Sequence, residues 1–325
     1  MEYIDTTQPW WNQSQVQNFN INGKLFFGVS DFNLNRRGFP VMLLNRTLYD
    51  QKYEENIYDV VFNGDWTMEK MAQLVSENYD DELEKPTYGY ICHKNIAGFY
   101  YAAGQTLMVR DRDGNWTVDW DVETISNVVE KVYEIINGNQ TLKTTWFNSN
   151  FATNEGWLAF TSKRALMFGF DLGGGFATLL RDLDFTTAFL PSPKLDKAQP
   201  NYYAINASGF TGIPNDAKDL ECSALIMEAF NEHSYYHFRE AYFDNYLAYT
   251  ISKDPNDYKV LELILDNTVY ELAYNLDSVG LTSGKGVGMM REIIIENAGT
   301  DVASYVQNNE ETFKKAMEAV IADIY

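Results

Sequence analysis

The chain has 325 residues, too many for one ordinary core and enough for two lobes. Hydrophobic residues make up 45% and aromatic residues 15%, which excludes a disordered chain and predicts a packed globular protein. Acidic residues outnumber basic ones by 46 to 25, and the net charge of −21 disfavours nucleic acid as a partner.

No segment approaches 18 consecutive apolar residues, so no membrane-spanning helix is expected. The first residues, "MEYIDTTQPWWNQSQ", lack the basic and apolar regions of a signal peptide, so we expect no export signal in this sequence. Cys92 and Cys222 lie far apart and cannot form a metal site alone, whereas a disulfide between them stays open.

The first half of the chain alternates strand and helix patterns. Lys24 to Ser30 is typical of a strand, and Asp65 or Thr67 can cap a helix that follows it. One face of that helix is apolar: Met68, Met71, Leu74 and Val75.

Residues 87–93 form the next predicted strand, before an aromatic loop, and residues 110–120 form a turn between two short extended pieces. Asp121 caps a predicted helix that is closed by Gly138. Its apolar face comprises Val122, Ile125, Val128, Val129 and Val132.

Two more strands are predicted in "RALMFGF" and "TTAFLPSP", and helices dominate beyond them, at 216–250, 256–275 and 308–324. In the last helix a buried stripe is expected, formed by Phe313, Ala316, Met317, Val320 and Ile321. This order of elements predicts an α/β protein with helix-covered sheets.

Three consecutive glycines, Gly173 to Gly175, follow the strand "RALMFGF" in a strand–turn–helix layout typical of phosphate-binding loops. The residues after them are Phe176 and Ala177, whereas a P-loop needs Lys and then Ser or Thr there. The stretch "GLTSGKGVG" also lacks the required spacing and hydroxyl, so neither stretch predicts a nucleotide site.

Two candidate metal sites are weak. His233 and His237 lie four residues apart on a predicted helix, but Ser234 stands where a zinc protease motif needs Glu. The loop with Asp111, Asp113, Asn115 and Asp119 is spaced like a calcium loop. Its sixth position is Trp116 and its twelfth is Val122, so a plain turn is the better interpretation and no metal is expected.

No nucleophile motif is present, so no catalytic residue is assigned. A pair of carboxylates acting on glycosidic bonds stays open as an alternative, because 46 acidic residues make some pair inevitable.

The order of several landmarks resembles the extracellular solute-binding proteins that deliver carbohydrates to ABC importers. They are "PWWNQSQVQNFNINGKLFFGVSD", "LLNRTLYD", "GDWTMEKM", "AAGQTLMVRDRDGNWTVDWDVE", "FTSKRALMFGFDLGGG" and "FLPSPKLDKAQPNY". This resemblance covers nearly the whole chain. It implies a two-lobed periplasmic-binding-protein-like fold with a hinge, closing on an oligosaccharide.

The resemblance also implies a division into lobes. Residues 1–34 and 204–265 would form an N-lobe, and residues 35–203 and 266–325 would form a C-lobe. Family members carry about a hundred more residues ahead of the "PWW" segment, so the N-lobe is expected to be incomplete.

The same resemblance implies a set of ligand-binding residues. They are Asp31, His93, Asn95, Phe99, Phe170, Asp171, Leu172 and Gly173. Aromatic rings suit the C–H faces of sugars, and carboxylate and amide groups suit their hydroxyls. For the glycine turn itself, a plain strand–helix connection is the equal alternative.

Four tryptophans are further candidates for stacking on a sugar, although a packing role is at least as well supported: Trp10, Trp11, Trp146 and Trp157. The resemblance further implies a monomer without cofactor or catalysed reaction, working outside the cell or in the periplasm with the importer's membrane subunits. A family member whose cleft no longer holds a ligand is the third interpretation.

Overall fold

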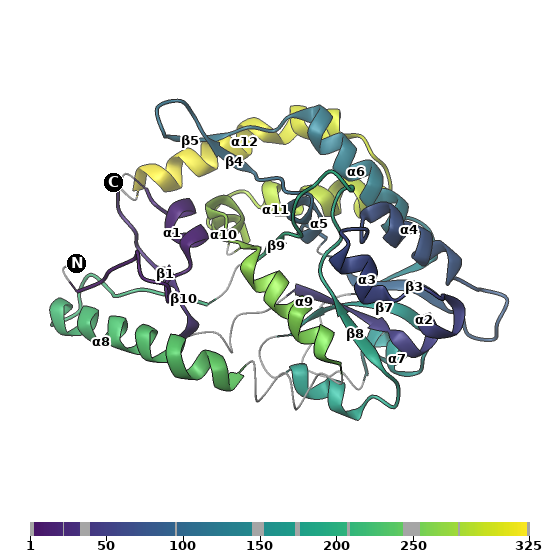
Figure 1. Ribbon diagram of the computed structural model, residues 1–325. Helices are drawn as coiled ribbons and strands as arrows, with labels where there is room; N and C mark the ends of the chain where they lie inside the picture. Colours follow the sequence, from purple (N-terminus) through teal and green to yellow (C-terminus); the bar gives the residue numbers. More distant parts are fainter. Residues whose placement is uncertain are drawn as a thin grey trace.

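The computed structural model describes residues 3–21, 23–32, 40–94, 96–144, 153–172, 176–206, 209–242, 254–278 and 280–323. Its largest sheet has five strands in the order β6-β3-β7-β2-β8 (Figure 1). Their bounds are Pro40–Asn45 (β2), Tyr88–His93 (β3), Thr141–Thr144 (β6), Ala165–Asp171 (β7) and Thr187–Leu190 (β8). Strands β3, β6 and β7 run parallel, and β2 is antiparallel to both β7 and β8.

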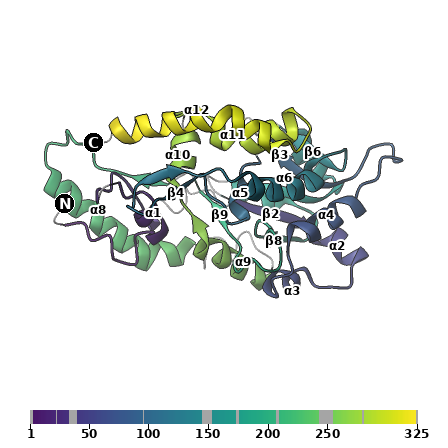
Figure 2. The same ribbon diagram turned by 90° about the horizontal axis from the view of Figure 1, so that it is seen from above.

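Helices surround this sheet, which confirms the predicted α/β class (Figures 1 and 2). Both α4 and α7 pack on β3, and α4 also packs on α6. The bounds of these helices are Arg46–Lys52 (α2), Ile57–Phe62 (α3), Met68–Glu77 (α4), Gly98–Ala102 (α5), Val122–Ile136 (α6) and Glu155–Thr161 (α7). A 3₁₀ segment, Phe176–Asp182, follows β7.

The two helices with the clearest sequence pattern form as predicted. Thr67 caps α4 by accepting a hydrogen bond from the Lys70 amide, and all four apolar residues of its predicted face are buried. Burial of each such side chain stabilises the fold by roughly 1.5–3 kcal/mol. Asp121 caps α6, and Gly138 takes the left-handed backbone conformation (φ +85°) just after its end. Val122 departs from the prediction, because it lies in the first turn and is exposed.

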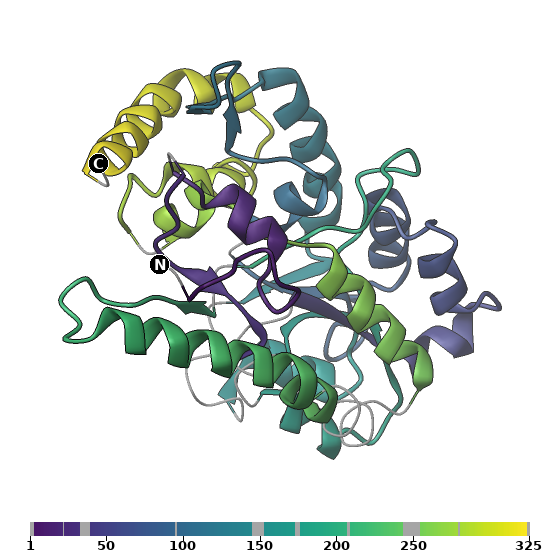
Figure 3. The same cartoon turned by 60° about the vertical axis from the view of Figure 1, so that its left-hand side comes forward.

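A second group of elements lies beside the sheet and comprises α1 (Gln13–Asn18), β1 (Gly28–Val29), β10 (Phe210–Thr211) and α8 (Leu220–His233). We call residues 3–32 and 209–242 the α8 half, and residues 40–206 and 254–323 the sheet half. Figure 3 shows α8 running along the edge of the molecule below β1 and α1. Of the strand predicted for residues 24–30, only Gly28 and Val29 pair with β10, while Lys24 and Ser30 form isolated bridges with Ile21 and Trp11.

Helices also cover the end of the chain. The predicted helix 256–275 is divided into α9 (Pro255–Asp266) and α10 (Leu272–Ser278) by a short strand, β11 (Thr268–Val269). A helix that the sequence pattern did not reveal, α11 (Lys285–Arg291), continues into a π-helical turn (Glu292–Glu296). The last predicted helix is present as α12 (Val302–Asp323), which begins six residues before the predicted start at 308. Of its predicted stripe, Phe313 and Met317 are fully buried, whereas Ala316, Val320 and Ile321 are half-buried. Among the helices in the described ranges, none is long and apolar enough to cross a membrane.

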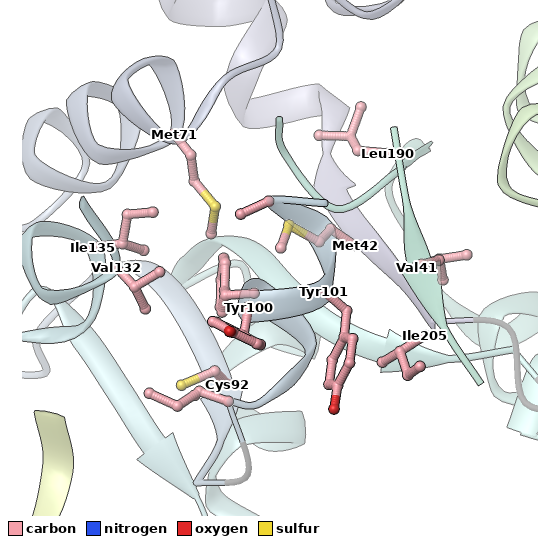
Figure 4. Close-up of a cluster of buried hydrophobic side chains, with 14 of the residues drawn as sticks. Val41, Met42, Met71, Cys92, Tyr100, Tyr101, Val132, Ile135, Leu190 and Ile205 are labelled. Atoms are coloured by element: carbon pink, nitrogen blue, oxygen red, sulfur yellow. The ribbon is translucent and has the colours of Figure 1, made fainter. Parts of the chain in front are cut away.

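Two parallel strands of the sheet half lie next to the α8 half, where α1 packs against β11. β9 (Ala204–Ile205), the last element of the sheet half before β10, pairs with β11. α5 packs against β9, and Tyr101 of α5 and Ile205 of β9 belong to one buried cluster together with Cys92, Met42 and Met71 (Figure 4). Cys92 is a free, buried thiol and Cys222 is free and exposed, so the disulfide that the sequence left open does not form.

α9 packs on the edge strand β8 and is held there by a buried carboxylate. Asp257 is 1% exposed, and its Oδ1 accepts hydrogen bonds from the Tyr58 hydroxyl and the Phe189 amide, both at 2.7 Å. α9 therefore contacts the sheet half, although the predicted lobe boundary groups residues up to 265 with the other lobe. The lobe boundaries themselves stay a prediction.

We expect Tyr58→Phe to lower the free energy of unfolding by roughly 1–3 kcal/mol, because a buried carboxylate loses one of its donors. Urea unfolding at pH 7 measures this change. Tyr53→Phe is the matched control, since the Tyr53 hydroxyl donates to Glu77 at the surface and its loss should cost much less. Equal losses in the two variants would contradict this account of α9.

Candidate functional site

An open pocket lies between the helical segment that follows α8 and the outer face of α9. Its volume is about 290 Å³. Its lining residues are Tyr235, Tyr236, Arg239, Glu240, Tyr258, Glu262 and Leu265. Because α9 packs on the sheet half, the two walls of the pocket come from different halves.

The local sequence explains both walls. Tyr258, Glu262 and Leu265 are spaced by four and three residues, so they share one face of α9 while Leu261 and Ile264 are buried on another. The opposite wall begins with a π-helical turn, Ser234–Phe238, which follows α8 directly. Turns of this kind are rare and are frequent at functional sites.

Arg239 connects the pocket to one of the predicted site residues. Its Nη1 lies 3.4 Å from Oδ2 of Asp31, which is almost fully buried just after β1. The guanidinium carbon also lies 6.0 Å from the ring centroid of Tyr235. Asp31 thus reaches the pocket through an ion pair, and Arg239 sets the charge on this side of it.

Several predicted residues gather at one edge of the five-stranded sheet. β3 and β7 are parallel neighbours, so His93 and Asp171 lie at the same edge, where β2 begins with Pro40 paired to Asp171. For Phe170 and Asp171 the structure describes the backbone only, and Asn95 and Gly173 lie outside the described residues. Their role in binding a ligand stays a prediction.

His93, Phe99 and Leu172 are described in full. Burial lowers the pKa of His93, and nearby Arg291 and Lys94 lower it further, so at pH 7 the neutral ring carries one donor and one acceptor. Phe99 is 6% exposed and packs edge-on against Tyr90, and Leu172 is fully buried. The last two side chains therefore belong to the core in this conformation, and their contact with a ligand stays a prediction.

The tryptophans that the sequence offered as stacking platforms have packing roles where they are described. The indole N–H groups of Trp10 and Trp11 both donate to the Glu228 carboxylate, at 2.9 and 3.1 Å. Trp157 packs against Phe160 and Phe168 beneath the sheet edge. Trp146 lies outside the described residues.

The loop of "GLTSGKGVG" is occupied by a carboxylate of the chain itself. Asp277 accepts hydrogen bonds from the amides of Gly284 and Val287, at 2.6 and 2.7 Å, at the start of α11. These are the amides that a phosphate would need in such a loop. The structure thus gives this stretch a structural role.

The two candidate metal sites have ordinary structural explanations. His233 and His237 lie with ring centroids 4.4 Å apart, and within the described ranges no three His, Cys, Asp or Glu residues are grouped to hold a metal. Asp111 accepts hydrogen bonds from the amides of Asp113 and Asn115 and from the Asn115 side chain. These bonds lower the pKa of Asp111 and close the turn.

Sequence reasoning missed the pocket residues. The signal was present in "SYYHFRE" and "NDYKVLEL", where aromatic and acidic residues recur at helical spacing. It could not be interpreted, because nothing in the sequence says that these two helices face each other.

No protein-family model and no curated protein sequence matches the chain. Solved structures do. An ABC substrate-binding protein from Listeria monocytogenes, in complex with cycloalternan, matches with a TM-score of 0.60 and 12% identity over 97% of this chain and 77% of that one. The chain has the fold of the carbohydrate solute-binding proteins.

Two further structures with this fold agree. A sugar transporter protein from Rhizobium etli in an open conformation matches with a TM-score of 0.62 and 14% identity, over 98% of this chain and 77% of that one. The maltotriose-binding protein of Thermus thermophilus, bound to maltotriose, matches with a TM-score of 0.53 and 14% identity, over 97% and 79% of the two chains. The predicted solute-binding-protein fold is therefore confirmed.

We expect the melting temperature of the protein to be insensitive to excess Ca²⁺ or EDTA, because the Asp111 carboxylate is already satisfied by its own loop. Differential scanning fluorimetry measures this. Asp111→Ala should lower the melting temperature with or without Ca²⁺, since the turn loses its closing bonds. A melting temperature that rises with Ca²⁺ in the wild type and not in Asp111→Ala would contradict the structural interpretation of this loop.

Proposed function

We propose that this chain is a solute-binding protein that captures an oligosaccharide between its two halves for delivery to the membrane subunits of an ABC importer. The observation that carries the proposal is a tyrosine-lined pocket with walls from both halves, in a chain with the fold of sugar-binding proteins. Of the similar structures, one holds cycloalternan and another holds maltotriose.

The chemistry of the pocket suits a sugar. Tyr235, Tyr236 and Tyr258 offer ring faces for the C–H faces of pyranose rings, and their hydroxyls can bond to sugar hydroxyls. Arg239 supplies donors, and Glu240 and Glu262 supply acceptors. The strongly acidic surface disfavours an anionic ligand and has little effect on a neutral one.

Closure follows from the position of the pocket. A ligand that contacts Tyr235 on one wall and Tyr258 on the other gains both sets of contacts only when the walls are close together. The ligand therefore favours the closed arrangement, and its differential affinity limits how far it shifts the equilibrium. The predicted residues would line the rest of the cleft: Asp31, His93, Asn95, Phe99, Phe170, Asp171, Leu172 and Gly173.

The remaining parts of the proposal follow from the resemblance to solute-binding proteins. The protein would work as a monomer outside the cell or in the periplasm. It would bind its ligand without a cofactor and release it unchanged.

A panel of neutral oligosaccharides should raise the melting temperature for one sugar class, because a ligand that binds only the native state stabilises it. Tyr258→Ala should then weaken calorimetric affinity for that sugar about 3- to 10-fold, the equivalent of one lost ring contact. Tyr79→Ala, which removes a tyrosine of the loop after α4, should leave the affinity unchanged. Binding that is unchanged in Tyr258→Ala would move the site elsewhere, and no stabilisation by any neutral sugar would contradict the proposal.

The enzyme alternative makes a different prediction. Two glutamates line the pocket, so a glycosidase would release reducing ends from the bound sugar and would lose this activity in Glu262→Gln. We expect no reducing ends above the buffer control after prolonged incubation of the wild type with that sugar. Release that disappears in Glu262→Gln would replace the binding-protein proposal with the enzyme.

A further inference from the structure

A fully buried glutamate joins two elements near the connection between the halves. Glu271 lies between β11 and α10 and is 2% exposed. Its Oε1 accepts hydrogen bonds from the amides of Leu107 and Met108, at 2.5 and 2.9 Å. Met108 begins β4 (Met108–Arg110), which forms a hairpin with β5 (Trp116–Val118).

The second carboxylate oxygen is incompletely satisfied. Within the described residues, Glu271 Oε2 and the Tyr101 hydroxyl, which lies close to it, make no hydrogen bond of normal geometry. Asn275 Oδ1, one helical turn after Glu271, is buried without a donor as well. The Tyr101 hydroxyl can donate to an ionised Oε2 or accept from a protonated one, so the hydrogen-bonding groups suit both charge states and burial decides between them.

The surroundings favour the neutral form. Burial raises the pKa of Glu271 to about 7, against the opposite effect of the nearby Tyr101 hydroxyl and of the amides of Met108, Leu107 and Tyr274. The facing ionisable side chains are the phenols of Tyr100 and Tyr101 on α5 and Tyr274 on α10. Within the described part of the chain, Glu271 forms no ion pair with a Lys, Arg or His side chain.

Both elements that Glu271 joins also hold α1 of the other half. On the β11 side, Asn18 Nδ2 donates to the Tyr270 carbonyl at 2.8 Å. On the hairpin side, Arg110 Nη2 donates to the Asn20 and Gln17 carbonyls, at 2.7 and 3.3 Å, and its guanidinium stacks over Trp116 at 4.1 Å. The relative position of β11 and the hairpin therefore fixes how α1 is seated on the sheet half.

We propose that Glu271 is a proton-controlled positioning residue. Its neutral carboxyl holds β11 and the β4–β5 hairpin together, and its ionisation weakens the contacts that hold α1 on the sheet half. Weaker contacts of α1 let the α8 half move relative to the sheet half. The effect on ligand affinity rests on the proposed function, whereas the loosening itself does not.

The sign follows from linkage. The pKa is raised above the ordinary value of 4.5, so the stabilising contribution of the neutral form is complete below about pH 4.5 and is lost as the pH rises through about 7. An opened hairpin exposes the carboxylate to water, so opening becomes easier as the pH rises from 6 to 8.

Amide hydrogen exchange on the ligand-free protein tests this, with rates corrected for the intrinsic effect of pH. In the wild type, we expect protection of the Leu107 and Met108 amides to fall about tenfold between pH 6 and pH 8, one factor of ten per pH unit above the pKa. Amides at the end of α1, such as that of Phe19, should follow in the same direction. A wild-type protection that is constant over this range would overturn the proposal.

Glu271→Gln is neutral at every pH and keeps an acceptor for both amides, so its protection should be high and independent of pH. Glu318→Gln, which removes an exposed carboxylate on α12, is the matched control and should keep the wild-type fall. A fall that persists in Glu271→Gln would assign the effect to another group. Tyr101→Phe removes a hydroxyl whose proximity lowers the pKa of Glu271, so it should extend the fall to higher pH. An unchanged midpoint would also contradict the proposal.

The ligand-free readout separates the two proposals. If the pH dependence is found and no sugar binds, Glu271 keeps its role and the proposed function fails. If a sugar binds, its affinity should change between pH 6 and pH 8 in the wild type and stay constant in Glu271→Gln.

Discussion

The parallel pairing of two short strands, β9 and β11, is the constraint on which the arrangement of the molecule depends. Chain connectivity makes β9 the last element of the sheet half before β10, and the Asn206 amide donates to the Val269 carbonyl at 3.0 Å as the chain leaves. Immediately after β11, the Tyr270 carbonyl binds α1 and the Glu271 carboxylate binds the hairpin. Pairing over two residues is weak by itself, so the buried bonds next to it determine how firmly the halves are joined.

The pocket forms where the two halves approach each other in this arrangement. α9 is fixed to the sheet half by Asp257, and the helical segment after α8 approaches it from the other half with Tyr235, Tyr236 and Arg239. The ion pair between Arg239 and Asp31 removes one positive and one negative charge from this acidic region. The tyrosine rings and the Glu240 and Glu262 carboxylates remain, and under the proposed function they would contact a neutral, hydroxyl-rich ligand.

Sequence patterns predicted the elements in which a capping residue or an apolar run coincides with the face that is buried in the structure. The caps at Thr67 and Asp121 and the apolar faces behind them gave α4 and α6, and the apolar run around Met167 gave β7. The break at β11 was missed, because Thr268 and Val269 continue an apolar helical pattern and become a strand only through pairing with β9. That pairing joins residues more than sixty positions apart, and no local pattern encodes it.

In the candidate site, too, some residues were predicted from the sequence and others were not. The resemblance to solute-binding proteins implied Asp31 and His93, and the structure puts Asp31 beside the pocket through Arg239 and His93 at the sheet edge. Tyr258 and Glu262 were not predicted, because their spacing on α9 is equally typical of a solvent-facing helix surface. Only the approach of a second helix, which depends on the fold, turns that surface into a wall of a pocket.

The most direct test of the central claim is hydrogen exchange of the protein with and without a bound oligosaccharide. Our account predicts that the sugar protects amides on both walls, in residues 235–240 and 258–265, at the same time. Protection confined to one wall, or found only at a distant surface, would contradict capture of a sugar between the two halves.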